Sequence, residues 1–523
     1  MDQIFEKFQT IKPKISSSYI KRMGILEFQE RILDLITDDM DLIDKMKYIQ
    51  IVYGNIRNFF IERFVEIRSH DEFNRVTTKI KHIIGRIDEL LNSLAYNYKL
   101  RGQIDNKGGC VIVDYLYHTM QQSYYAEETD IEKIRACIDI LQRTDQPCIE
   151  LSDYKTSMSR CNVVYKFVCP RSFMLVDEYV KAAEILYGKV GKEEMSEFSP
   201  ESHISELKTG SEFLLRVPYD NYDFVTSFIA GMCINTTIES IWITLYRVNP
   251  NDSIVIKYLK EAAAKKKNVF VFVEIYAHGD EINNSKIVEE LKQAGCSVNV
   301  NYFGYKVHGK MFLAMDRDGK LYGHIGTGNY NEKTARQYTD IHYITGNEEI
   351  THEMLNILIS LFEKRIYHTQ LEHPKIFSSP SNIRPEIIRL INQEICKGKN
   401  GRIYIKVNNL CDNEISNLLY NAANAGVDVK IICRTSCNLI PTNNIQVRSK
   451  AGIYLEHDRI YIFGDKCYIG SADLFYRNLS KRFEIMCEVN SSKILKYFIL
   501  VWESKPIFEL QVRGSRKRWR KIN

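Results

Sequence analysis

The chain has 523 residues, and its 45% hydrophobic and 26% charged content is ordinary for a globular protein of roughly three or four domains. The net charge of +5 is small for this length and gives by itself no argument for a nucleic acid partner. The 13 cysteines contain no C-x-x-C pair, which argues against a zinc site or a disulfide framework and favours reduced, mostly buried thiols.

The N-terminal sequence MDQIFEKFQT has neither a basic region nor an apolar run, so we expect no secretory signal peptide. The longest apolar runs, at residues 269–273 and 497–502, are far shorter than the ~20 residues that a spanning helix needs. We therefore expect a cytoplasmic protein, and peripheral contact with a membrane stays open.

A helical domain is expected over residues 1–99. Apolar side chains recur there at the i, i+3, i+4 spacing of a helix face, and proline is absent from residues 18–99. The first of these apolar positions are Ile25, Phe28, Ile32 and Leu35. Residues 100–210 carry weaker patterns, a strand at 163–168 and a helix at 179–187, and we expect a reduced middle domain there.

Residues 211–374 and 375–506 both alternate strands with helices, which predicts parallel β-α-β units in a mixed α/β fold. In the first stretch, strands are expected at residues 241–246, 269–275 and 298–303, with helices at 254–265 and 286–294. In the second, strands are expected at residues 402–407, 427–433 and 445–448, with a helix at 413–425. Prolines and serines gather near residues 374–385 and mark the join between the two domains.

Residues 507–523 are expected to form a basic C-terminal tail. Its cations are Arg513, Arg516, Lys517, Arg518, Arg520 and Lys521. A solvated, frayed end is the more frequent meaning of such a charge run. The functional alternative is a tether for a polyanion or an acidic lipid surface.

A short motif, H-x-[KR] followed by a turn and G-[ST]-x-[ND], occurs once in each α/β domain. It begins at His308 with Lys310 in the first domain, and at His457 with Arg459 in the second. Residues i and i+2 of a strand share a face, so each histidine is expected to point the same way as its cation. The glycines of the turn would let backbone N–H groups approach an anion. An imidazole, a cation and a small-residue loop together suit a phosphoryl group.

One H-x-K pair is close to noise, and a lone histidine on a strand is more often a hydrogen-bonded core residue than a catalyst. Two copies with the same downstream turn are a specific signal, and they favour a functional role for both His308 and His457.

The sequence around both copies resembles the bacterial polyphosphate kinases that use a phosphohistidine. The matching stretches are VPYDNYD from Val217, ITLYRV from Ile243, HIGTGNYNEKTARQYTD from His324, KVNNLCDNEISNLLYNAANAG from Lys406, and LEHDRIYIF with the following YIGSADLFYRNLSKRFE. The resemblance is strong over residues 213–489 and 18–67, and weak or absent over 97–206. It implies an N-terminal helical domain that contacts a nucleotide, and two phospholipase-D-like domains that form one cleft.

The resemblance implies reversible transfer of the ATP γ-phosphate to inorganic polyphosphate, with Mg²⁺ as cofactor and no nucleic acid partner. By resemblance, His308 is the nucleophile and Lys310 neutralises the transferring oxygens. His457 would move a proton and contact the nucleotide. A dimerising head domain occupies the place of residues 100–210 in the family, so a homo-oligomer is one expectation.

Other side chains match binding positions of the family. By resemblance, Asn55, Tyr338 and Arg448 contact the nucleotide, although an asparagine on a helix face often only bonds its own structure. Arg247 matches a phosphate–magnesium site, where an arginine has no lone pair for a metal and can grip only phosphate oxygens. A basic tunnel for polyphosphate is expected from Lys406, Arg434, Arg336 and Arg477. Each of these alone is more often a surface charge or an aliphatic stem packed on the core.

The sequence departs from the family pattern at several positions. His278 stands where the metal site of the family has an arginine, and Ile440 stands at a second arginine position. Arg57 and Asn58 follow Asn55 where the family has acidic residues. Two alternatives to a polyphosphate kinase therefore stay open. One is a phospholipase-D-like phosphodiesterase or nuclease, and the other is a catalytically weakened homologue that binds polyphosphate without making it.

Overall fold

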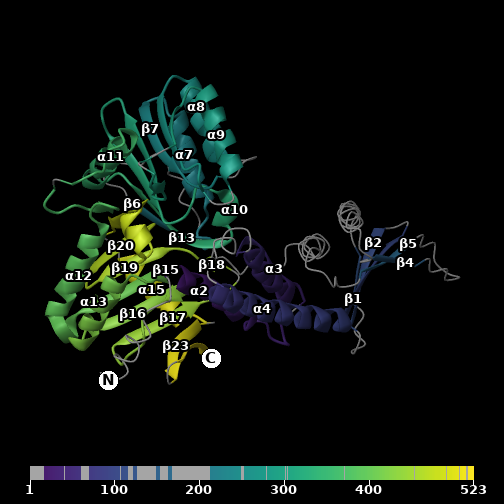
Figure 1. Cartoon of the computed structure of the whole chain (residues 1–523). Coiled ribbons are helices and arrows are strands. Elements are labelled where there is room, and N and C mark those ends of the chain that lie inside the picture. Colours follow the sequence, from purple (N-terminus) through teal and green to yellow (C-terminus); the bar gives the residue numbers. More distant parts are fainter. Residues whose placement is uncertain are drawn as a thin grey trace. The chain divides into compact units, whose positions relative to one another are not determined.

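The computed structural model describes residues 17–40, 42–59, 70–105, 108–115, 122–125, 149–152, 163–167 and 212–522, apart from 249–252, 278–279, 301, 303, 370, 453, 490–491, 506 and 514–515. The chain divides into two compact units, Leu26–Glu194 and Met1–Ile25 with Met195–Asn523. Figure 1 labels the elements of both units. Within the described ranges, no helix is both long enough and apolar enough to cross a membrane.

The unit formed by residues 26–194 contains helices and an antiparallel sheet. Helix α2 (Ser17–Leu33) ends in it, and α3 (Leu42–Phe59) and α4 (His70–Asn97) follow. The sheet has the order β3-β2-β1-β5-β4 and consists of β1 (Tyr98–Asp105), β2 (Gly108–Tyr115), β3 (Gln122–Tyr125), β4 (Ile149–Ser152) and β5 (Val163–Phe167). The strand predicted at residues 163–168 is confirmed, whereas the helix predicted at 179–187 lies outside the described residues.

The first α/β domain follows the predicted alternation. Its elements are β6 (Glu212–Val217), α7 (Asp223–Ile234), β7 (Ile238–Leu245), α8 (Ile254–Ala264), β8 (Asn268–Val273), α9 (Glu281–Gln293), β9 (Ser297–Asn299), β10 (Lys306–Val307), β11 (Lys310–Asp316), β12 (Leu321–Gly326), α10 (Glu332–Ala335), β13 (Tyr338–Thr345) and α11 (Glu348–Phe362). Strands β7, β8 and β9 are parallel, as the β-α-β pattern predicted, and β11, β12 and β13 continue the sheet antiparallel.

The second α/β domain repeats this plan. Its elements are β14 (Ile376–Ser378), α12 (Ile383–Lys397), β15 (Arg402–Leu410), α13 (Asn413–Asn424), β16 (Asp428–Cys437), β17 (Ile445–Lys450), β18 (Leu455–Glu456), β19 (Arg459–Phe463), β20 (Lys466–Gly470), α14 (Tyr476–Ser480), β21 (Arg482–Phe483), β22 (Ile485–Glu488) and α15 (Ser492–Glu503). Strands β15, β16 and β17 are parallel, and β19, β20 and β22 run antiparallel beside them.

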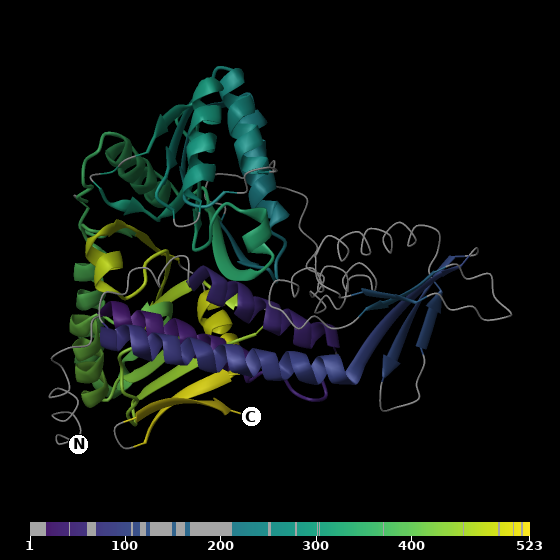
Figure 2. The same cartoon turned by 45° about the vertical axis from the view of Figure 1, so that its right-hand side comes forward.

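One apolar core is shared by the two α/β domains. Helices α7, α8 and α9 cover the outer face of the first sheet, and α12 and α13 cover the outer face of the second (Figures 1 and 2). Between the sheets, Met354 of α11 and Phe498 of α15 belong to a buried cluster that also holds Ile325 and Ile460 from the two sheets. Since each fully buried side chain of this kind stabilises by about 1.5–3 kcal/mol, packing fixes how one sheet faces the other.

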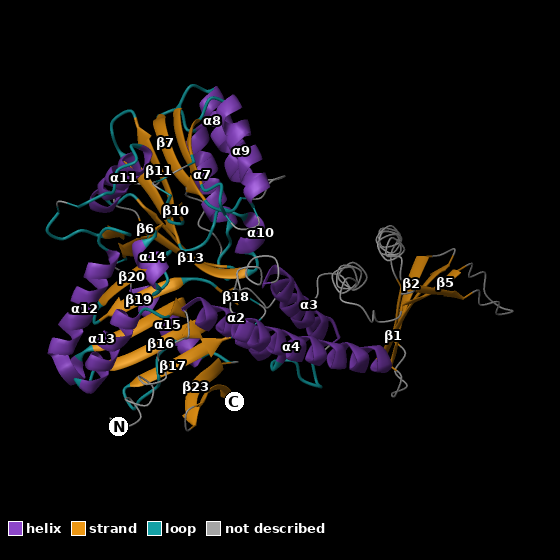
Figure 3. Cartoon of the chain, in the orientation of Figure 1, coloured by secondary structure: helices purple, strands orange, loops and turns teal. Residues whose placement is uncertain are grey.

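Residues 507–513 and 516–522 form two paired strands, which corrects the prediction of a frayed basic tail. Strand β23 (Ile507–Arg513) pairs antiparallel with β17, and β24 (Arg516–Ile522) pairs with β23, so both extend the second sheet (Figure 3). Phe508 and Leu510 are buried, and Trp519 packs against the outer core of this domain. These alternating apolar anchors outweigh the charge run that suggested a solvated end.

Candidate functional site

The two copies of the motif are held together by two short ladders that cross between the domains. Strand β10, just before His308, pairs with β21 of the second domain, and β18, just before His457, pairs with β13 of the first. The His308 N–H donates to Phe483 O at 2.8 Å, and the Asp458 N–H donates to Thr339 O at 2.8 Å. The backbone of the opposite domain therefore anchors each histidine segment.

A carboxylate from the opposite domain also holds each imidazole. Glu484 Oε2 lies 2.8 Å from Nδ1 of His308, and Asp340 Oδ1 lies 2.9 Å from Nδ1 of His457. Because a carboxylate can only accept, Nδ1 of each neutral ring carries the proton and Nε2 carries the lone pair. In both histidines Nε2 is thus the nitrogen that carries the lone pair.

Burial keeps both imidazoles neutral at ordinary pH. His308 is 8% exposed, and burial, followed by the charge of Lys310, holds its pKa well below the usual value. For His457, burial outweighs the opposing effect of Asp340, and with Arg459 it lowers the pKa to about 4. Each ring is therefore a free base at ordinary pH.

The glycine-rich turn after β12 holds the carboxylate of Asp340 in place. Thr327 Oγ1 donates to Asp340 Oδ1 at 2.6 Å and accepts from the Ile341 N–H at 2.9 Å, and Ser471 accepts the matching backbone bond in the second domain. Burial disfavours the Asp340 anion, but His457 and Thr327 outweigh it and lower the pKa of Asp340 to about 2. A Cβ on Gly328 would lie 2.3 Å from Asp340 Oδ2, so this close approach explains the glycine.

Lys310 carries the least satisfied charge of the site. Its side chain is buried, and Nζ has no hydrogen-bond partner among the described residues. Nζ lies 5.3 Å from the centre of the Tyr246 ring, whose face-to-edge contact with His308 spans 4.7 Å. Burial lowers the pKa of Lys310 well below its usual value, which the charge of Glu484 only partly offsets. An incoming anion would supply the missing partner.

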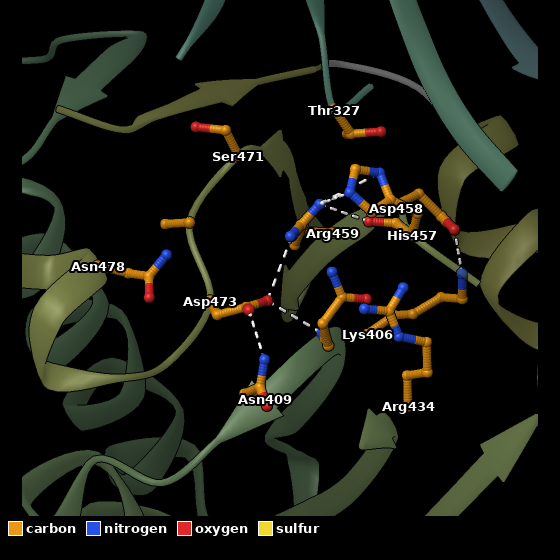
Figure 4. Close-up of polar contacts among 12 residues, drawn as sticks. Thr327, Lys406, Asn409, Arg434, His457, Asp458, Arg459, Ser471, Asp473 and Asn478 are labelled. Atoms are coloured by element: carbon orange, nitrogen blue, oxygen red, sulfur yellow. Dashed lines mark hydrogen bonds and ion pairs between the residues drawn. The ribbon is translucent and has the colours of Figure 1, made fainter. Parts of the chain in front are cut away.

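Arg459, the counterpart of Lys310, is fully engaged. Its Nε donates to Asp473 Oδ1 at 3.2 Å (Figure 4). Its Nη1 donates to the backbone O of His457 at 2.7 Å and lies 3.2 Å from Nε2 of the His457 ring. Burial opposes the charge of Arg459, but Asp473 and Asp340 outweigh it and raise the pKa of Arg459. Asp473 is itself fixed by Asn409 Nδ2 at 2.8 Å, so Arg459 holds His457 in place.

Lys406 does not line an open basic tunnel, which corrects the sequence prediction. Its side chain is buried, and Nζ lies 2.7 Å from Glu456 Oε2 and bonds directly to Asp458 Oδ1 (Figure 4). Burial disfavours its charge, but the two carboxylates outweigh burial and raise the pKa of Lys406. The spacing of residues in the sequence gave no sign of this pairing, because Glu456 and Asp458 are far from Lys406 along the chain.

Two other predicted residues do join the site. The rings of Tyr338 and His457 are 5.4 Å apart. Arg434 donates from Nη1 to Glu456 O at 2.8 Å, and burial together with Arg459 lowers its pKa to about 10. The charge of Arg434 in turn helps to lower the pKa of His457.

The other predicted cations have different surroundings. Arg448 donates from Nη1 to Trp502 O at 2.9 Å and lies 4.2 Å over the Trp502 ring, so it is engaged with α15. Arg336 and Arg477 are exposed. Asn55 belongs to the other compact unit, where its Nδ2 donates to Gln29 Oε1 at 2.9 Å.

The described residues do not fit a magnesium ion held by the protein. Arg247 Nε pairs with Asp280 Oδ2 at 3.1 Å, and an arginine cannot ligate a metal. In the described part of the chain, no group of three or more His, Cys, Asp or Glu side chains is placed to hold one. His278 lies outside the described residues. At the second departure, the Ile440 N–H donates to Tyr420 Oη at 2.7 Å.

Sequence reasoning missed the partners that cross between the domains, Asp340 and Glu484, and also Arg482. The Nε of Arg482 is buried without a hydrogen-bond partner among the described residues, and its charge acts on His308. Aligning the two copies was the available signal. Tyr338-Thr339-Asp340 and Arg482-Phe483-Glu484 follow the two glycine turns at the same spacing.

Comparison with known proteins agrees with this geometry. Residues 203–368 match the model of polyphosphate kinase C-terminal domain 1, and residues 376–518 match C-terminal domain 2. The polyphosphate kinase of Staphylococcus haemolyticus is 38% identical over 313 residues, which cover 57% of this chain and 43% of the relative. That of Helicobacter pylori strain 26695 is 36% identical over 317 residues, which cover 59% and 46%. The matches thus span less than half the length of these curated relatives.

A solved structure extends the likeness to the whole fold. The polyphosphate kinase of Porphyromonas gingivalis superimposes with a TM-score of 0.65, covering 96% of each chain at 20% sequence identity. At that identity the match shows a shared mixed α/β fold and no more. The two domain models together match more than half of the sequence, over both domains that supply the histidines. The chain therefore belongs to the polyphosphate kinase family.

Proposed function

We propose that this chain transfers the γ-phosphate of ATP reversibly to inorganic polyphosphate through a phosphohistidine on His308. One observation carries the proposal: a free Nε2 lone pair on His308 beside the buried ammonium of Lys310, which lacks a hydrogen-bond partner among the described residues. A nucleophile and an uncompensated cation meet the two needs of phosphoryl transfer, positioning and charge neutralisation.

In the first step, His308 Nε2 attacks the γ-phosphorus. The P–N bond forms while the P–O bond to ADP breaks, and ADP leaves with the electron pair. Glu484 accepts the hydrogen bond from Nδ1 and stabilises the positive charge that the ring acquires. Lys310 neutralises the oxygens in transit, and the charge of Arg482 acts at the same ring.

In the second step, a terminal oxygen of polyphosphate attacks the phosphohistidine. The new P–O bond forms, the P–N bond breaks, and Nε2 of His308 regains its lone pair. His457 Nε2, a free base with Nδ1 bonded to Asp340, takes a proton from the attacking oxygen. The same residues run the reaction in reverse.

The remaining assignments rest on the resemblance. We propose that Asn55, Tyr338 and Arg448 hold the nucleotide, with residues 1–99 as its helical domain and 100–210 as the middle domain. Arg336, Arg434 and Arg477 would meet polyphosphate, and Arg247 the phosphates that carry Mg²⁺. Mg²⁺ keeps few protein ligands and usually arrives with substrate phosphates. A cytoplasmic location, a homo-oligomer and peripheral membrane contact are proposals of the same kind.

A phosphodiesterase is the second candidate, because two histidines paired with carboxylates also suit cleavage of a phosphodiester. Turnover of a chromogenic phosphodiester, compared with ATP consumption in the presence of polyphosphate, separates the two activities. For a kinase we expect only the second.

The decisive experiment is incubation with γ-labelled ATP and Mg²⁺, followed by a search for label that is stable in base and labile in acid. We expect such label on the wild type and on the control variant His352→Ala, since His352 is exposed on α11. Absence of label from both would reject a phosphohistidine enzyme.

A further inference from the structure

We propose that Thr339, Asp458 and Lys406 form an interdomain latch that positions His457 for proton transfer. The inference rests on the proposed function for its catalytic consequence. The residues themselves are a hydroxyl of the first domain and an ion pair of the second.

The latch is a set of short bonds in the interior. Thr339 Oγ1 donates to Asp458 Oδ1 at 2.7 Å, while the Asp458 N–H donates back to Thr339 O at 2.8 Å. Lys406 Nζ bridges Asp458 and Glu456. Thr339, Asp458, Lys406 and Glu456 are 0%, 1%, 2% and 4% exposed, so water does not compete for these bonds.

The latch fixes both ends of the hydrogen bond that orients His457. On one side, His457 stands between Glu456 and Asp458, both of which Lys406 holds. On the other side, Thr339 directly precedes Asp340, whose carboxylate faces His457 Nδ1. A shift of Thr339 against Asp458 would therefore move donor and acceptor apart.

The first domain lacks this device at the matching positions, where Gly309 corresponds to Asp458 and Thr244 to Lys406. Thr244 Oγ1 donates to Gly309 O at 2.7 Å, a bond without charge. Phe483 of the second domain lies opposite Gly309, as Thr339 of the first domain lies opposite Asp458, and a Cβ on Gly309 would lie 3.0 Å from the Phe483 ring. A large ring opposite glycine is thus exchanged for a small hydroxyl opposite a carboxylate.

This difference between the two domains gives a reason for burying Lys406 together with Glu456 and Asp458. Burying three charges costs solvation that their mutual attraction does not fully return, so such a group is poorly explained by stability alone. Its directional bonds instead define one register between the domains. The latch acts on His457, whereas His308 is held by Phe483 O and Glu484.

The test compares Thr339→Val, which removes only the hydroxyl, with Thr339→Ser, which restores it. Thr351→Val is the matched control, because Thr351 is also buried but lies on α11, where its hydroxyl bonds to Asn347 O and Glu348 O at the start of the helix. We expect Thr339→Val to lower kcat by about 10- to 100-fold, by analogy with the loss on removing a partner that orients a metal-binding histidine. The KM for ATP and the label on His308 should hardly change, and Thr339→Ser should recover most of the loss.

A second readout does not depend on activity. In protein with ¹⁵N-labelled histidine, the Nδ1–H proton of His457 should resonate far downfield because it bonds to Asp340, and His457→Ala assigns it. Thr339→Val should move or broaden this resonance, while Thr351→Val leaves it unchanged.

Unchanged kcat and an unchanged resonance in Thr339→Val would overturn the latch. An equal loss of label and turnover, with a lowered melting temperature, would also overturn it and indicate a purely structural bond. If wild-type protein forms no phosphohistidine, the proposed function fails, and the resonance alone then decides whether Thr339 positions His457.

Discussion

The two halves of the site share one frame but hold their cations in opposite ways. Lys310 lies beside His308 with no hydrogen-bond partner among the described residues, while Arg459 is bonded to Asp473 and to the backbone of His457. The first half is thus prepared to receive an anion, and the second to hold a base in place. The two copies of one motif therefore differ in charge: one cation is without a hydrogen-bond partner among the described residues, and the other is paired.

The largest difference between the halves is expected when each histidine is removed. His308→Ala should abolish both phosphohistidine label and polyphosphate synthesis, because the nucleophile is gone. His457→Ala should still accept label but turn over about 10²- to 10⁴-fold more slowly, the usual contribution of a general acid or base. Label that persists in His308→Ala would contradict this assignment of the two roles.

Replacing the carboxylate that holds each imidazole from the opposite domain should also affect the two halves differently. Asp340→Asn should lower kcat by up to about 10⁴-fold, as when the carboxylate behind a catalytic histidine is replaced by its amide. Asp340 raises the pKa of His457 against burial, so its loss should lower that pKa below about 4 and move the acid limb of the pH–rate profile to lower pH.

Glu484→Gln should instead slow formation of the label, since Glu484 faces His308. Rapid-quench measurement of labelling and steady-state measurement of turnover separate the two effects. If both variants slowed the same step, the division of labour between the halves would be wrong.

Lys310→Met and Arg459→Met should differ in stability more than in activity. Loss of Lys310 should lower kcat by about 10²- to 10³-fold, as for one donor to a transition-state oxyanion. It should leave the free energy of unfolding unchanged or higher, because the buried charge that is removed has no hydrogen-bond partner among the described residues. Loss of Arg459 should cost about 3–5 kcal/mol, since Asp473 is left buried without its cation. Urea unfolding of both variants checks this, and equal destabilisation would show that Lys310 has a partner.

The smallest expected effect is on the stability of the fold at acid pH. It arises from a buried histidine pair in the first domain that has no counterpart at the matching positions of the second. His324 and His342 of the first domain are buried and 3.0 Å apart, where the second domain has Tyr468 and Met486. Burial lowers the pKa of His342 to about 4, so between about pH 6.5 and 4 the unfolded chain binds more protons than the folded one.

The stabilisation that this neutral histidine provides is therefore complete above about pH 6.5 and is lost as the pH falls through 4, up to about 3 kcal/mol. We expect His342→Met to flatten the acid side of a pH series of urea unfolding, and the exposed His352→Gln to leave it as in the wild type. A wild-type slope in His342→Met would place the acid sensitivity elsewhere.

The sequence predicted what short-range pattern determines. Strand and helix periodicity located β7 to β9 and β15 to β17, and the repeated H-x-[KR] motif located His308 and His457. The sequence could not predict features that depend on contacts between residues far apart in the chain. Lys406 was predicted to be a free cation, because its partners lie far along the chain, beside His457. The C-terminal strands were predicted to be a tail, because the buried Phe508 and Leu510 stand before a run of basic residues. Aligning the copies would have recovered Glu484, but not the hydrogen bonds that join the domains.

Under the proposed function, the crossed carboxylates also set the molecularity of the reaction. Each α/β domain carries a histidine whose orienting acid belongs to the other, so a chain cut between α11 and β14 would yield two fragments without a complete pair in either. Activity of such fragments would rise with the product of their concentrations and vanish on dilution. In the intact chain, the covalent connection keeps the effective concentration of each acid constant, so the rate per molecule is independent of how much protein is present.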